Sequence, residues 1–149
     1  MIRAKIVLVL IMLGFLVNVS GCGPSLGPAF SRIETVPEKE GLVYIYRPAK
    51  FFGGGVYYDI RANGNVINTF YQGGYYPYYA NPGEIEFSAK TEASSSVTID
   101  VKPGQVYYLR GTVGIGFFVG HPHLDVVSPE IGEKEIQDCK LLPEVNKKE

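Results

Sequence analysis

His121, His123 and Asp125 alternate along one short stretch and are the residues best suited to hold a metal. Because successive residues of an extended strand point to opposite faces, all three would lie on one side of a strand. Two histidines placed in this way can share a zinc ion, and a metal-dependent hydrolase is the activity that such a site would support. Pro122 separates the two histidines, and the chain contains no distant ligand motif. The pattern therefore favours surface polar residues, and the hydrolase stays an alternative.

Nucleophilic and cofactor-dependent catalysis find less support in the sequence. Ser94, Ser95 and Ser96 form a polar run without a nucleophile-elbow pattern, and only two histidines are present to serve as a base. The glycines at 53–55 are not followed by the Lys-Ser/Thr pair and helix of a phosphate-binding loop. We therefore expect no enzyme, no catalytic residue, no cofactor and no metal.

The amino-terminal stretch that ends at Cys22 has the parts of a secretory signal. Arg3 and Lys5 form a positive start, an apolar run follows over residues 6–17, and small residues precede the cysteine. The run is shorter than the roughly 20 apolar residues of a spanning helix, which disfavours an uncleaved membrane anchor. The sequence VSGC at 19–22 resembles the lipobox of bacterial lipoproteins, and a cleaved signal without lipid is the alternative. The resemblance implies cleavage after residue 21, diacylation of the Cys22 sulfur by chains such as palmitate, and often acylation of the new amino terminus.

Acylation of Cys22 would also determine where the protein resides. Two or more acyl chains hold a protein stably on a bilayer, whereas one does not. In enteric-type bacteria an acidic residue directly after the cysteine tends to keep a lipoprotein at the inner membrane, and this chain has Gly23. The resemblance therefore implies the outer membrane, on the side that faces the periplasm. Cys139 is then the only thiol left, so no internal disulfide can form; we expect a half-buried structural thiol, with an intermolecular bridge as the alternative.

The size and charge of the mature chain narrow the possible partners. Removal of residues 1–21 from the 149-residue chain leaves 128 residues, which suits one domain. Arg3 and Lys5 leave with the signal, so 12 basic side chains face 15 acidic ones, a net charge of about −3. This balance lacks the basic footprint that nucleic acid requires, and it gives no electrostatic membrane patch.

Alternating β-branched and aromatic residues predict an all-β domain. We expect an antiparallel β-sandwich or small barrel of seven to eight strands. The expected strands lie at 42–47, 56–62, 65–71, 75–79, 84–89, 96–101, 106–113 and 115–120. Asn63-Gly64 predicts a type I′ hairpin turn, and Pro82-Gly83 and Pro103-Gly104 predict turns between consecutive antiparallel strands.

The two ends of the domain carry further signals. Ser128-Pro129-Glu130 predicts the start of one short C-terminal helix that ends by residue 141, with Ile131, Ile136 and Cys139 toward the sheet. Before the domain, three apolar residues (Phe30, Ile33 and Val36) can dock on it and shorten the tether. The expected divisions are a signal peptide at 1–21, a lipidated cysteine and tether at 22–40, the sandwich domain at 41–141 and a disordered tail at 142–149.

Tyrosines occur as adjacent pairs at 57–58, 75–76, 78–79 and 107–108. Each pair within a strand places one ring on each face, so we expect Tyr58 and Tyr107 in the core and Tyr57 and Tyr108 on a polar face. Ordinary cross-strand pairing explains such rings. The alternative is an aromatic and arginine surface that stacks on a glycan, a peptide or a partner protein. This candidate binding surface consists of Tyr57, Arg61, Tyr75, Tyr76, Tyr78, Tyr79, Tyr108 and Arg110.

Four elements of the sequence together resemble a family of bacterial lipoproteins known only as a domain of unknown function. They are GLVYIYRP at 41–48, the Asn63-Gly64 hairpin, the tyrosine-containing strand that leads to Pro82-Gly83, and KPGQVYYLR at 102–110. The resemblance covers about residues 41–141. It implies an envelope location and a β-rich fold, and it implies no activity and no functional residues.

The favoured function is a non-enzymatic envelope lipoprotein, attached to the bilayer through acylated Cys22, whose domain binds a partner protein or an envelope assembly. One alternative is a glycan- or peptidoglycan-binding module that uses the tyrosine surface, and a metal-dependent hydrolase is the second alternative. A contiguous exposed tyrosine patch beside a groove would favour the glycan module. Burial of those rings would favour the protein-binding lipoprotein.

Overall fold

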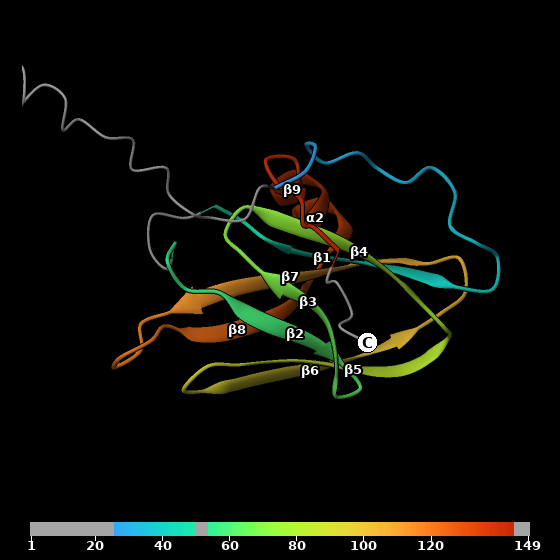
Figure 1. Ribbon diagram of the computed structural model, residues 1–149. Coiled ribbons are helices and arrows are strands. Elements are labelled where there is room, and N and C mark those ends of the chain that lie inside the picture. The colour runs from blue at the N-terminus through green and yellow to red at the C-terminus, as the bar shows by residue number, and fades with distance from the viewer. Residues whose placement is uncertain (1–25, 50–53, 145–149) are drawn as a thin grey trace, which may run out of the picture.

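The computed structural model describes residues 26–49 and 54–144, which form nine strands and one short helix (Figure 1). The expected signal peptide and Cys22 lie outside the described residues. Among the described residues, no helix is long and apolar enough to cross a membrane. In chain order the elements are β1 Gly41–Arg47, β2 Tyr58–Ala62, β3 Asn65–Phe70, β4 Gly74–Ala80, β5 Gly83–Lys90, β6 Ser94–Val101, β7 Val106–Gly114, β8 His121–Val127, α2 Pro129–Ile136 and β9 Lys140–Leu141.

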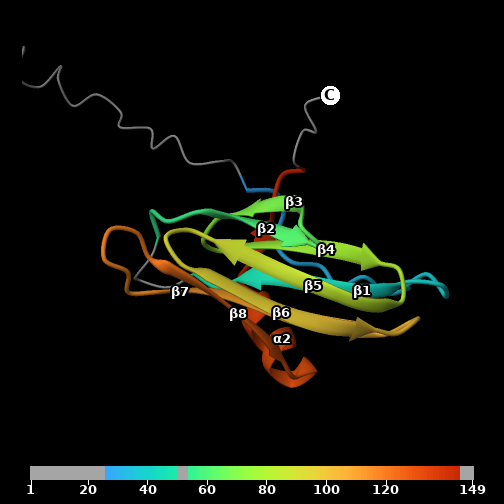
Figure 2. The same cartoon turned by 90° about the horizontal axis from the view of Figure 1, so that it is seen from below.

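The strands form two sheets that pack face to face as a sandwich, and the sandwich does not close into a barrel (Figure 2). One sheet has five strands in the order β8-β7-β1-β4-β9, and the other has four in the order β3-β2-β5-β6. The predicted all-β sandwich with a C-terminal helix is therefore confirmed. The core between the sheets arises from the alternating pattern, as in β5, where Ile85, Phe87 and Ala89 point inward between exposed neighbours.

The predicted turns occur, but two of them join consecutive strands that do not pair with each other. Asn63 and Gly64 have φ values of 47° and 81°, as a type I′ turn requires, and they join the antiparallel pair β2 and β3. The turns at Pro82-Gly83 and Pro103-Gly104 instead carry the chain from one sheet to the other. Consecutive pairing was thus the wrong expectation at these turns. In the five-stranded sheet, β1 pairs antiparallel with β4 and parallel with β7.

The prediction of a last strand at 115–120 is wrong. These residues form the loop between β7 and β8, and β8 begins at His121. The apolar side chains of this loop are exposed because none of the elements that the structure describes packs over them. The expected disordered tail also begins too early, because Leu142 is buried and its N–H donates to the carbonyl of Tyr75 at 2.9 Å.

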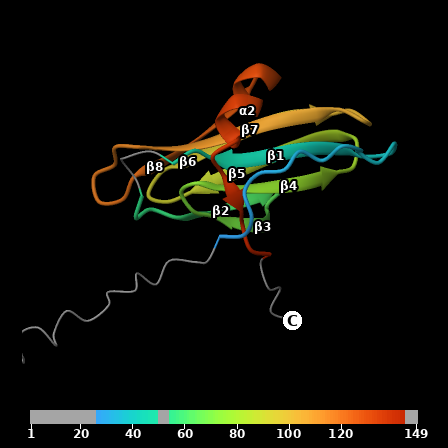
Figure 3. The same ribbon diagram turned by 90° about the horizontal axis from the view of Figure 1, so that it is seen from above.

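The helix α2 and the amino-terminal segment both cover the outer face of the five-stranded sheet, as seen from above in Figure 3. Ile136 and Cys139 are buried there, as predicted, whereas Ile131 points to solvent and that prediction is wrong. Since both faces of the sheet are covered at β1, every residue of this strand is buried. Among the described residues, no helix or segment covers the outer face of the four-stranded sheet in this way.

The amino-terminal segment at 26–36 docks on the domain. The N–H of Gly27 donates to the carbonyl of Leu141 at 2.7 Å, and the N–H of Phe30 donates to that of Cys139 at 2.9 Å. The Phe30 ring makes edge contacts with two tyrosines of the sheet, and Ile33 and Val36 pack against the same cluster. The chain between Cys22 and the folded domain is therefore much shorter than the 22–40 tether expected from composition.

Candidate interaction surface

Most of the tyrosines expected at the binding surface are packed inside the protein. Tyr75 and Tyr108 are 5% and 1% exposed, and Tyr76 and Tyr78 are half-buried against the core between the sheets. The prediction that Tyr108 lies on an open polar face is wrong, because α2 covers it. Tyr58 is buried, as predicted, and Tyr107 packs partly buried against the same core.

Arg110 is held in a network of ion pairs and hydrogen bonds beside α2. Its guanidinium donates to Glu135 of α2 at 3.1 Å and reaches Asp125 of β8 at 3.5 Å. The hydroxyl of Tyr46 donates to the same Glu135 at 2.7 Å, and burial together with this carboxylate raises the pKa of Tyr46. Burial alone would lower the pKa of Arg110, but the attraction of Glu135 outweighs it and raises that pKa. The network links β1, β7, β8 and α2. It pairs the positive charge of Arg110, which was expected to face a ligand, with carboxylates of the protein itself.

Of the expected surface, Tyr57, Tyr79 and Arg61 remain exposed, and they do not gather. Arg61 lies on β2 of the four-stranded sheet and Tyr57 directly precedes that strand, whereas Tyr79 lies on β4 in the five-stranded sheet. The structure therefore does not form the contiguous tyrosine patch that a glycan-binding module would use.

His121, His123 and Asp125 lie in β8, and the two histidines point to different partners. His121 Nε2 lies 3.1 Å from Oε1 of Glu92, and His123 Nε2 lies 3.0 Å from Oδ1 of Asp125. Within the described ranges, no group of three or more His, Cys, Asp or Glu side chains is placed to hold a metal ion. Nothing in this arrangement supports the hydrolase alternative.

The outer face of the four-stranded sheet is the first surface that stays free, and we call it the open face. The helix α2 packs on β7 of the five-stranded sheet, and in Figures 1 and 2 it lies away from β2, β3 and β5. At one end of the open face, the ring of Tyr57 stacks on that of Tyr71 with centroids 5.5 Å apart. Beside them, the hydroxyl of Thr69 donates to Asp59 at 2.7 Å. Across the rest of the face, outward side chains of both charges are exposed, namely Arg61, Glu84, Glu86, Lys90 and Asp100.

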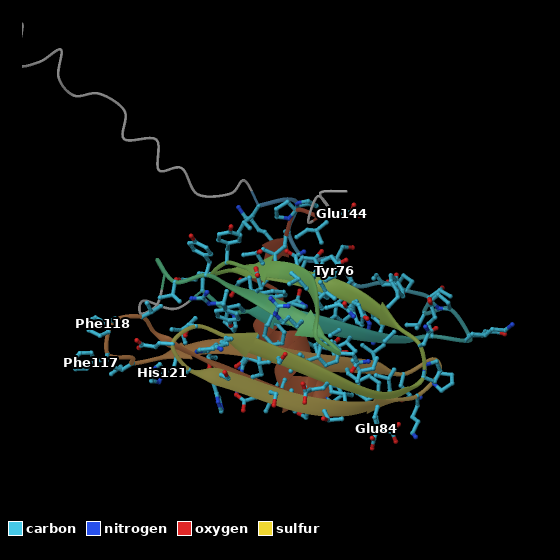
Figure 4. All side chains as sticks on the ribbon, turned by 60° about the horizontal axis from the view of Figure 1, so that its bottom comes forward. Tyr76, Glu84, Phe117, Phe118, His121 and Glu144 are labelled. Carbon is cyan, nitrogen blue, oxygen red and sulfur yellow. The ribbon has the colours of Figure 1, made fainter. Side chains whose placement is uncertain are left out.

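A second free surface is the loop at 115–120 between β7 and β8, which we call the tip loop. Ile115, Phe117 and Phe118 are 96%, 88% and 86% exposed, and Val119 is exposed as well. The two phenylalanine rings contact each other edge to face with centroids 4.7 Å apart. Figure 4 shows both rings projecting beyond the sheets at one end of the sandwich, near His121.

The carboxylate of Glu92, in the connection between β5 and β6, holds the backbone of the tip loop. It accepts the N–H of Phe117 at 2.8 Å and the N–H of Phe118 at 3.3 Å, and it contacts His121. Partial desolvation would raise the pKa of Glu92, but hydrogen bonds from Val119, Phe118 and Phe117 outweigh it and lower the pKa. Glu92 is therefore ionised at neutral pH and fixes the loop.

Sequence reasoning missed this surface because a short apolar run between glycines has the same composition as a buried strand. The glycines at 114, 116 and 120 are the signal that favours a loop, since glycine is depleted in strands.

The fold and its free surfaces define the chain as an all-β sandwich with one covered and one open outer face. A family model described as "Protein of unknown function (DUF2846)" matches residues 37–121, and the chain belongs to this family. The matched region runs from just before β1 to the first residue of β8 and includes the tip loop. No curated protein and no solved structure matches the chain significantly.

Proposed function

We propose that the mature protein is a lipid-anchored lipoprotein of the bacterial envelope that has no enzymatic activity and binds a partner protein or envelope assembly. The lipobox-like residues at 19–22 support the anchor, and Gly23 supports the outer membrane on its periplasmic side. The lipid bilayer is then one partner of the protein, and an envelope protein is the other.

The observation that carries this proposal is the docking of the amino-terminal segment. Leu26 is the fourth residue after Cys22, and Gly27 is already hydrogen-bonded to Leu141. At roughly 3.6 Å per extended residue, the chain from Cys22 to Leu26 spans at most about 14 Å. A lipid on Cys22 would thus hold the folded domain close to the bilayer surface.

The open face supports the choice of a protein as the partner. It is a broad strand surface with charges of both signs and one aromatic pair, the exposed Tyr57 stacked on the half-buried Tyr71. Stacking on sugar rings would need several exposed aromatic side chains side by side, and most tyrosines of this chain are packed inside. Protein interfaces are enriched in tyrosine and arginine, as at Tyr57 and Arg61 of this face. The glycan-binding alternative has only the single pair in its favour.

The anchor is tested by Cys22→Ser, expressed in a bacterium that processes lipoproteins. We expect the variant to appear in the soluble fraction or to keep its signal, and the unchanged protein to fractionate with the outer membrane. Cys139→Ser is the matched control, because Cys139 is buried in the domain and its replacement leaves the anchor intact. A processed Cys22→Ser chain that stayed on the membrane would refute lipidation, and residence of the unchanged protein at the inner membrane would refute the location.

The partner is tested by affinity capture of the lipidated protein from crosslinked envelopes. A protein bound at the open face should be lost from the capture with Arg61→Glu and retained with Ile131→Ser, which alters the exposed side of α2. Equal capture by both variants would exclude the open face as the binding site.

A further inference from the structure

The tip loop carries several exposed apolar side chains that do not pack into either hydrophobic core. Single exposed apolar residues are common on soluble proteins, whereas contiguous ones indicate an interaction site. Here Ile115, Phe117, Phe118 and Val119 follow one another in a loop of six residues, and the glycines between them let the side chains spread. The loop contributes no side chain to either core, so its apolar character serves something outside the domain.

Two backbone amides of the tip loop already have hydrogen-bond acceptors within the protein. An amide that enters a medium free of water without a hydrogen-bond partner costs several kcal/mol. The amides of Phe117 and Phe118 already donate to Glu92, so they need no water when the loop is desolvated. The carboxylate itself lies at the base of the loop, where it also contacts His121.

The chain from Cys22 joins the domain at the β9 edge of the five-stranded sheet, whereas the tip loop projects from the opposite edge, between β7 and β8. Gly27 bonds to Leu141, which pairs with Tyr75 of β4. Tyr75 in turn pairs with Tyr46 of β1, and Tyr46 pairs with Arg110 of β7. That level lies at the middle of β7, which continues for four more residues to Gly114, where the tip loop begins; Figure 3 shows the loop projecting at one end of the sheet.

The chemistry of the loop fits lipid better than a charged partner. The loop carries no ionisable side chain, so it has no group that would select a partner by charge. Aromatic and aliphatic side chains enter the boundary between headgroups and acyl chains, where binding strength grows with buried apolar area. Weak insertion becomes effective when an anchor nearby raises the local concentration to millimolar values.

We infer that the tip loop is a second membrane contact, which inserts Phe117 and Phe118 into the bilayer that holds the acyl chains of Cys22. The inference rests on the proposed function for the identity of that bilayer. The two contacts together would fix the orientation of the domain and leave the open face accessible to a partner from the periplasm.

The absence of tryptophan from the chain allows a direct test. Phe117→Trp makes a lipidated mature protein with a single tryptophan at the tip. Tyr79→Trp is the matched control, because Tyr79 is exposed but pairs with Leu42 at the opposite end of β1. Both proteins are reconstituted on phosphatidylethanolamine and phosphatidylglycerol vesicles with and without brominated acyl chains, and tryptophan emission is recorded.

We expect the emission of Phe117→Trp to shift to the blue and to be quenched several-fold more strongly than that of Tyr79→Trp, with little dependence on salt. Equal quenching of the two proteins on the vesicles would overturn the inference and leave the anchor standing. A blue shift of Phe117→Trp that required envelope proteins and was absent with lipid alone would identify a protein as the occupant and would also overturn it.

A second arm separates failure of the loop from failure of the anchor. The unlipidated Cys22→Ser chain is sedimented with the same vesicles at high lipid concentration, alone and with Phe117→Ser and Phe118→Ser. A several-fold loss of binding in the double-serine chain supports the loop even if Cys22 is never acylated. Binding that is unaffected by the serines, or absent from both chains, contradicts the inference.

Discussion

At the scale of single residues, the buried hydroxyl of Tyr58 lacks a partner within the described part of the chain, although its ring packs against the buried guanidinium of Arg47. The ring of Tyr58 lies under the guanidinium of Arg47, whose carbon is 5.3 Å from the ring centroid. The Tyr58 hydroxyl points toward Gly111, and it has no hydrogen-bond partner among the residues that the structure describes. A buried polar group without a partner costs about 1–3 kcal/mol, so this hydroxyl lowers stability while the ring raises it.

Tyr58→Phe removes the hydroxyl and keeps the ring over which Arg47 lies. We expect the free energy of unfolding, measured by urea titration, to rise by about 1 kcal/mol. Tyr57→Phe is the control, because Tyr57 is exposed and its hydroxyl is hydrated; it should change stability by less than about 0.5 kcal/mol. A destabilised Tyr58→Phe would show that the hydroxyl has a partner in solution.

The buried tyrosine and thiol also predict how stability depends on pH. Burial raises the pKa of Tyr58 and the pKa of Cys139 to about 12, above their ordinary values of 10.0 and 9.0. The folded protein therefore keeps protons that the unfolded chain loses, so this stability is complete below pH 9 and decreases as the pH rises to about 12. Urea titrations across this range should show the decrease, and Tyr58→Phe should make it shallower above pH 10. A free energy of unfolding that stays constant above pH 9 would contradict the prediction.

At the scale of elements, the packing of α2 on the five-stranded sheet depends on a glycine. Gly132 is buried in the middle of the helix, directly over the ring of Tyr108. A Cβ at this position would overlap Cβ and Cγ of Tyr108, atoms that cannot move without a shift of the strand. The helix approaches the sheet closely only because residue 132 has no side chain.

Gly132→Ala is expected to lower the free energy of unfolding by about 1–2 kcal/mol. The overlap with Tyr108 costs about 1–3 kcal/mol, and the higher helix propensity of alanine returns part of it. Urea titration measures the change, and Gly55→Ala is the control, since a Cβ there meets nothing within 4 Å. Equal stability of the two variants would mean that α2 does not pack on Tyr108 in solution.

At the scale of the whole molecule, the amino-terminal segment at 26–36 packs against β9 and the outer face of the five-stranded sheet. It runs beside β9 and packs on the aromatic cluster under α2, where Phe30 contacts Tyr44 and Tyr75 at centroid distances of 5.3 and 5.2 Å. If Cys22 is lipidated as proposed, the docking of this segment would limit how far the domain can move from the bilayer.

Phe30→Ala is expected to lower stability by about 2 kcal/mol and to release the segment, because it removes two aromatic contacts and part of the apolar burial. Hydrogen exchange should show faster exchange at the amides of Gly27 and Phe30, both of which donate to the C-terminal strand region. Arg32→Ala is the control; its ion pair with Glu133 is exposed and contributes less than about 0.5 kcal/mol. Unchanged exchange in Phe30→Ala would show that the hydrogen bonds alone hold the segment.

The features that the sequence predicted correctly are those determined by neighbouring residues. Alternation along the chain indicated the strands through β7, because inward and outward side chains repeat every second residue wherever one face is buried. Asn63-Gly64 specified its hairpin, since both residues tolerate positive φ, and Ser128-Pro129-Glu130 marked the start of α2.

Only the tertiary structure decided how the strands pair beyond the Asn63-Gly64 hairpin, which face is covered and which apolar residues stay outside. Pairing of β1 with β4 and β7 joins segments far apart in sequence, and no local pattern specifies such partners. Tyr108 is buried and Phe117 is exposed for the same reason, because burial depends on whether another element packs over a side chain. The helix α2 covers Tyr108, whereas none of the described elements covers Phe117. Lipidation of Cys22 is a prediction from the sequence, whereas the length of chain between Cys22 and the domain followed from the docking of residues 26–36, which is a property of the fold.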